Sequence, residues 1–79
     1  MNIIAGVLFA VSAFSVDADI AKVEKLFRAG RADEAKMAIG RFLTANDSSK
    51  AYLEVGNLYA RQKRWPDAVH YYEIVTQRD

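Results

Sequence analysis

The sequence predicts an all-α fold built from antiparallel helical hairpins. From Asp17 onward, apolar residues recur at intervals of three and four, which is the spacing of one helix face. Turn-forming residues gather at 30–31, 46–49 and 64–66. Runs of β-branched residues and Asn-Gly or Asp-Gly hairpin signals are missing, which argues against strands. The length of 79 residues fits one small domain.

The first predicted helix covers about residues 17–29. Asp17 or Asp19 can cap its start, and Gly30 fits a left-handed stop at its end. Glu24 and Arg28 are four residues apart, which predicts an ion pair on the solvent side. The apolar face of this helix consists of Ile20, Val23, Leu26 and Phe27.

The second predicted helix runs from about Ala32 to Ala45. Asp33 and Glu34 lie in its first turn, where the helix dipole favours negative charge. Its apolar stripe consists of Ala35, Ile39, Phe42 and Leu43.

Two further helices complete the prediction. Ser48 or Ser49 can cap a third helix that ends near Arg61, and its stripe is Tyr52, Val55, Gly56 and Tyr59. A fourth helix is expected to start at Pro66, because proline is favoured in the first helical turn. The stripe of this last helix is Ala68, Tyr71, Tyr72 and Val75. Short turns between helices of this length predict antiparallel hairpins.

Composition argues against several classes of function. The chain has no cysteine and one histidine, so neither a disulfide framework nor a multi-histidine metal site within one chain is expected. The net charge of +1 gives no general electrostatic reason to bind nucleic acid. No nucleophile–base pair or glycine-rich phosphate loop stands out, and we expect neither an enzyme nor a cofactor.

The two predicted hairpins are related by an internal repeat. One repeat period is the shift that carries Ala35 onto Ala68. The same shift superimposes further apolar positions: Leu26 on Tyr59, Ile39 on Tyr72 and Phe42 on Val75. A period of about 33–34 residues made of two helices is typical of helical solenoids.

The second hairpin, about residues 49–78, resembles a tetratricopeptide repeat. Small residues at Gly56 and Ala68 would let its helices approach closely, while aromatic side chains fill the space between helices. The positions that carry the resemblance are Tyr52, Val55, Gly56, Tyr59, Trp65, Ala68 and Tyr72. We therefore expect Tyr52, Gly56, Tyr59, Trp65 and Ala68 to pack within the repeat.

The first hairpin, about residues 17–46, is similar to a degenerate copy of the same repeat. It keeps Gly30 and Ala35 in the stretch GRADEA, but has Val23 where the family has glycine. The resemblance implies a right-handed solenoid over residues 17–79 that binds proteins or peptides and has no catalytic role. It also implies a binding groove near Leu53, Asn57 and Arg61. Some family members clamp a carboxylate with paired lysine and asparagine, and Leu53 replaces that lysine here.

Residues 1–16 carry no charged side chain, and three interpretations are open. The run Ile3–Phe14 has a suitable length for the apolar region of a signal peptide, with a passable cleavage site at residues 16–18, although no basic residue precedes it. A second interpretation is that the segment anchors the chain in a membrane, although the run is somewhat shorter than the roughly 20 apolar residues that a spanning helix needs. Alternatively it is a helix buried between subunits, since Phe9 lies one repeat period before Phe42, and Ala5 one period before Ala38.

The third interpretation gives our leading hypothesis for function. A two-repeat stack has two open ends, and two sticky ends that differ produce head-to-tail assembly. We expect a homo-oligomer or polymer, such as an extracellular or cell-envelope filament. The alternative is a membrane-anchored adaptor that recruits a partner protein or peptide. The expected assembly interface contains Ile3, Ile4, Val7, Leu8, Phe9, Val11, Phe14, Tyr71, Tyr72 and Val75.

Overall fold

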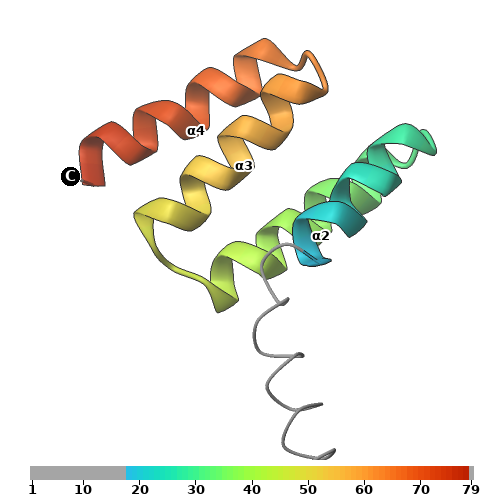
Figure 1. Cartoon of the computed structure of the whole chain (residues 1–79), viewed down its shortest axis with the longest axis horizontal. Helices are drawn as coiled ribbons and strands as arrows, with labels where there is room; N and C mark the ends of the chain where they lie inside the picture. Colours follow the sequence, from blue (N-terminus) through green and yellow to red (C-terminus); the bar gives the residue numbers. More distant parts are fainter. Residues whose placement is uncertain (1–17, 79) are drawn as a thin grey trace, which may run out of the picture.

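The computed structural model describes residues 18–78, and every regular element in this part of the chain is an α-helix. A first helix over 18–28 is followed by α2 (Ala32–Ala45), α3 (Ser49–Arg61) and α4 (Trp65–Arg78) (Figure 1). The prediction of an all-α fold is confirmed for these residues. The predicted N-terminal helix over 1–16 lies outside the described residues.

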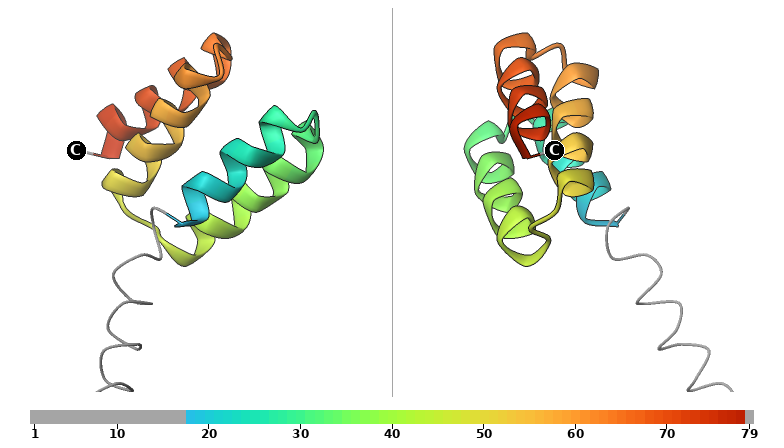
Figure 2. Two further views of the ribbon diagram at one scale, coloured as in Figure 1. Left: turned by 45° about the vertical axis from the view of Figure 1, so that its right-hand side comes forward. Right: turned by 90° about the vertical axis from the view of Figure 1, so that its left-hand side faces the viewer.

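The four helices form two hairpins. Helix 18–28 and α2 make the first hairpin, and α3 and α4 make the second, as the two layers in Figure 2 show. The second hairpin meets the first mainly through α3. Val55 and Leu58 of α3 are completely buried in the core, together with Val23 and Ile39 of the first hairpin. This third helix therefore belongs to both layers.

The helix boundaries follow from local hydrogen bonding. The Ser48 hydroxyl caps α3 by accepting a hydrogen bond of 3.1 Å from the Ala51 N–H, which decides between the two predicted serines. Asp19 lies inside helix 18–28 and does not cap it, contrary to one of the predicted alternatives. The fourth helix begins at Trp65, one residue before the predicted start, so that Pro66 occupies its first turn.

Both hairpins turn in the same way, at positions one repeat period apart. Gly30 has a φ of 78°, and Lys63 has a φ of 59°. After helix 18–28, Gly30 N–H bonds to the Phe27 carbonyl and the next N–H to the Leu26 carbonyl. The N–H groups of Lys63 and Arg64 repeat this pattern after α3. Each first helix thus ends in a Schellman motif, which needs a residue in the left-handed region.

Close approach of α3 and α4 depends on Gly56. A Cβ atom at this position would lie only 2.7 Å from Cε1 and 2.8 Å from Cδ1 of Tyr72. The Tyr72 ring is held there because its hydroxyl donates a 2.7 Å hydrogen bond to Oδ1 of Asn57. The absence of a side chain at Gly56 therefore leaves room for the Tyr72 ring, in agreement with the close approach expected from the sequence pattern.

Replacing Gly56 by alanine should lower the free energy of unfolding. Displacing the Tyr72 ring costs about 1–3 kcal/mol, which exceeds the gain of about 1 kcal/mol from the helix propensity of alanine. Gly40 is the matched control, because a Cβ atom there meets nothing within 4 Å. Gly40→Ala should raise stability by up to about 1 kcal/mol. Urea denaturation of both variants measures the difference, and an equal response would contradict the role given to Tyr72.

Replacing Lys63 by glycine should stabilise the chain by about 1 kcal/mol, because a side chain at positive φ is strained and glycine relieves this strain at some cost in unfolded-state entropy. Gly30→Ala provides the reverse test, since a Cβ atom there is strained by its φ of 78° although nothing lies within 4 Å. Thermal unfolding should show midpoints shifted in opposite directions, and Lys63→Ala should leave the strain in place. Shifts of the same sign for the two glycine exchanges would rule out this explanation.

Candidate interaction surfaces

An aromatic ladder joins the two hairpins. The Tyr59 ring on α3 meets Phe27 of helix 18–28 edge-on at 5.6 Å between centroids, and stacks on Tyr71 of α4 at 5.5 Å. Tyr71 in turn stacks on Tyr52 at 6.1 Å. Tyr59 is 3% exposed, and Ala68 on α4 is 1% exposed. These tyrosines and Ala68 therefore pack between the helices of the described chain.

Trp65 is the exception among these predicted packing residues. Its side chain is 58% exposed, so it does not fill the space between the helices as expected. Ala32, the residue one repeat period earlier, is partly buried against the core. The second hairpin is the last described layer, and no further helix of the described chain lies against it. The aromatic side chain is left at the surface.

Two arginines near the second turn reach back to the first hairpin. Nε of Arg61 lies 2.8 Å from Oε2 of Glu24, and this hydrogen bond raises the pKa of Arg61. The Arg64 guanidinium lies 4.6 Å from the centroid of the Phe27 ring. Glu24 thus pairs across the two hairpins. The sequence had predicted a pair with Arg28 along the same helix instead. A third arginine, Arg78, makes a 3.0 Å ion pair with Asp47.

The predicted groove residues on α3 have different environments. Leu53 is 41% exposed. The Asn57 side chain accepts the hydrogen bond from Tyr72, and the Arg61 side chain is paired with Glu24. Both polar side chains are therefore engaged inside the chain, and Leu53 is the exposed apolar member of the three. A carboxylate clamp at Asn57 would have to use the Nδ2 amide group, because Oδ1 already accepts the hydrogen bond from Tyr72.

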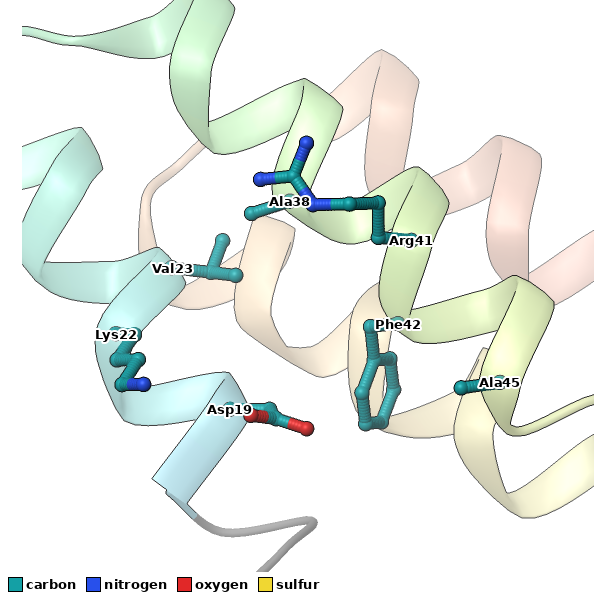
Figure 3. A pocket seen from close by; sticks show the side chains of 7 residues that line it. All are labelled: Asp19, Lys22, Val23, Ala38, Arg41, Phe42 and Ala45. Carbon is teal, nitrogen blue, oxygen red and sulfur yellow. The ribbon is translucent and has the colours of Figure 1, made fainter.

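A groove of about 260 Å³ opens between helix 18–28 and α2 (Figure 3). Val23 and Phe42 form its floor, and they are 2% and 5% exposed. Two small residues, Ala38 and Ala45, lie on the α2 side. Charged side chains at the edge are Asp19, Lys22 and Arg41. The ribbons of α3 and α4 lie behind these side chains in Figure 3, so the groove faces away from the second hairpin.

Exposed apolar side chains gather on the second hairpin. Of the four large apolar residues that are exposed among residues 18–78, Leu53, Trp65 and Val69 belong to α3 or α4, and Met37 to α2. Trp65 and Val69 are four residues apart and share one face of α4. Leu53 is the counterpart of Ile20, which is only 6% exposed in the first hairpin. The second hairpin thus exposes apolar surface at Leu53, whereas the counterpart position in the first hairpin is buried.

The predicted assembly residues on α4 are already in use within the chain. Tyr71 belongs to the aromatic ladder, and Tyr72 lies over Gly56. Both are half-buried, as is Val75. The other seven predicted assembly residues, Ile3, Ile4, Val7, Leu8, Phe9, Val11 and Phe14, lie outside the described residues. Sequence reasoning did not single out Val69, because a lone apolar residue on a polar face gives no periodic signal.

Among the described residues, no helix is both long and apolar enough to cross a membrane. The same part of the chain has no group of three or more histidine, cysteine or acidic side chains placed to hold a metal ion. Comparison with protein-family models, curated proteins and solved structures gives no match for this chain. The proposed function therefore rests on the surfaces described above.

Alkaline pH should destabilise the fold through Tyr59. Burial, with smaller contributions from Tyr71 and Asp67, raises the pKa of Tyr59 to about 12 from an ordinary value of 10.0. This stabilisation is fully present below pH 10 and is lost as the pH rises through 12, because the unfolded chain releases the proton first. The loss amounts to about 2–3 kcal/mol.

Denaturant titrations between pH 9 and pH 12 measure this loss, and Tyr59→Phe is the control. The variant should show a smaller decrease over the same range, since Tyr71, whose pKa burial also raises, remains. Ultraviolet absorbance of tyrosinate reports ionisation directly. A native chain in which all four tyrosines ionise near pH 10 would contradict the buried position of the Tyr59 hydroxyl.

Proposed function

We propose that the chain is a non-enzymatic helical-repeat protein of the tetratricopeptide type, whose function is protein–protein interaction through head-to-tail self-assembly. Residues 1–16 would insert between successive copies. A polymer of such subunits would be a structural filament, in the cell envelope or outside the cell.

The observation that carries this proposal is that the two ends of the described chain differ: one is hollowed by a groove, and the other exposes large apolar side chains. One end has the groove over Val23 and Phe42, and the other has exposed Leu53, Trp65 and Val69. Unlike surfaces at opposite ends favour a heterologous contact, which repeats in one direction. The uncharged segment 1–16 supplies apolar side chains that need such surfaces.

Energetics support an association of this kind. Each Val, Leu, Ile or Phe side chain that becomes fully buried contributes about 1.5–3 kcal/mol. Several such side chains in residues 1–16, together with Trp65 and Val69, suffice to offset an association cost of about 4–15 kcal/mol.

A membrane-anchored adaptor is the second candidate, and the same uncharged segment favours it. In that case residues 1–16 would contact lipid, and the exposed residues of the second hairpin would recruit a partner protein. The two candidates differ in their need for detergent, because a protein–protein interface forms without it.

Removal of residues 2–16 should abolish assembly. The full chain, at 8.9 kDa per copy, should form particles of higher and concentration-dependent mass in buffer without detergent. The truncated chain should remain a small species, because the apolar segment that joins the copies is gone. Light scattering coupled to size-exclusion chromatography measures both masses.

Two control variants separate the ends of the molecule. Val69→Glu places a charge on the exposed face of α4 and should reduce the mass of the particles, whereas Lys36→Glu at the equivalent exposed position of α2 should not. Unchanged assembly of the truncated chain would refute the proposal. A full chain that is recovered only with detergent would favour the adaptor.

A further inference from the structure

We infer that residues 1–12 dock as a helix in the groove between helix 18–28 and α2 of their own chain. This inference rests on the repeat arrangement of the proposed function and adds the receiving surface for one side of the segment. It leaves the other side of the segment for a second copy.

The groove is hollow where its counterpart in the second hairpin is filled. Shifting the groove by one repeat period places Asp19 at Tyr52 and Ala38 at Tyr71. These two tyrosines stack on each other at 6.1 Å and close the corresponding space. With an aspartate and an alanine in their place, the first hairpin leaves about 260 Å³ to be filled from outside.

The structure also shows which residues lie beside Tyr52, the counterpart of Asp19 in the second hairpin. Four residues of α2 and its following linker line a hollow beside Tyr52: Gly40, Leu43, Thr44 and Asp47. One repeat period earlier these four positions are Val7, Ala10, Val11 and Phe14, which would lie beside Asp19. All four are apolar, whereas three of their counterparts are glycine, threonine and aspartate. The segment thus places apolar side chains where the neighbour of the second hairpin has mostly small or polar ones.

The connection between a helix that ends at residue 12 and helix 18–28 would be as short as the connection between α2 and α3. Residues 46–48 are sufficient to lead from the end of α2 to the start of α3. A helix that ends at residue 12 has the equivalent connection, 13–15, and Ser15 lies one repeat period before the capping Ser48. Helix 18–28 begins at the end of the first hairpin where α2 finishes (Figure 1), which is the end that a short connection must reach. Such a short link favours the groove of the same chain over that of another copy.

The chemistry of the groove suits an uncharged occupant. Its floor is Val23 and Phe42, and residues 1–16 contain no charged side chain to bury there. Lys22 and Arg41 can cover the flanks of a docked helix with their aliphatic stems while their charges stay in water. Ala45 at the edge is exposed in the described chain and would become covered.

The repeat period also assigns the two sides of the segment. Phe42 of α2 packs in the core with helix 18–28 of its own hairpin, and its counterpart is Phe9. Val11 is the counterpart of Thr44, which lies beside the following hairpin at Tyr52. Val11 therefore faces the groove of the same chain, and Phe9 faces away from it, toward the next copy.

Thiol labelling tests this docking in the full chain, which has no cysteine of its own. An Ala45→Cys variant carries the reporter at the edge of the groove, and Lys36→Cys carries a control thiol that is exposed on α2 outside it. Each is made with and without Val11→Asp, and the rate of alkylation by a small maleimide is measured over a dilution series. The expected result is that Val11→Asp speeds labelling at position 45 at least about tenfold, equivalent to about 1.4 kcal/mol, and leaves position 36 unchanged.

Dilution and one further variant separate docking within the chain from assembly between chains. Protection at position 45 should persist at concentrations where light scattering reports a monomer, and in Phe9→Asp, which should lower only the particle mass. Val11→Leu should retain the protection, because it keeps an apolar side chain. Equal labelling with and without Val11→Asp would overturn the inference. Protection that disappears on dilution or in Phe9→Asp would also overturn it, while leaving head-to-tail assembly intact.

Discussion

The contact of the Tyr59 ring with Phe27 on one side and Tyr71 on the other is the interaction on which the arrangement of the helices depends. Phe27 belongs to the first hairpin, Tyr59 to α3, and Tyr71 to α4, so that one ring contacts both of its neighbouring helices. Val55 and Leu58 of the same helix are completely buried in the same core. The position of α3 then follows from the ladder, and with it the angle at which the two hairpins meet. Without this helix, the first hairpin would have no second layer to cover its apolar face.

Local sequence signals were sufficient to predict the helices. Ala32–Ala45 was predicted at its observed bounds, and α3 ends at Arg61 as predicted, with its cap at one of the two predicted serines. Apolar spacing and capping residues act within a few positions of the chain. Gly30 predicted its turn for the same reason. The equivalent turn at Lys63 has no glycine, and its left-handed backbone could be seen only in the structure. A turn tolerates an unfavourable residue where the surrounding packing fixes its conformation.

Contacts between the hairpins were harder to predict. Glu24 has an arginine four residues later, yet it pairs with Arg61, which is distant in sequence and close in space. Trp65 matches an aromatic position in the predicted repeat pattern but lies exposed, and no other helix among the described residues covers it. The candidate surfaces share this limitation. Periodicity identifies the residues that face the core of a hairpin, whereas the groove arises because the small side chains of Ala38 and Ala45 on α2 leave space beside helix 18–28.

The arginines at the edges of the hairpin interface have a mechanical consequence. Arg61 bridges to Glu24 near one end, and Arg78 bridges to Asp47 near the other, through long side chains that are partly in solvent. Exposed ion pairs of this kind contribute at most about 1 kcal/mol each and can adjust their geometry at little cost. The aromatic centre is rigid by comparison, because its rings are packed on both sides. The interface is therefore tightly packed at its aromatic centre and held at its edges by ion pairs whose geometry can adjust.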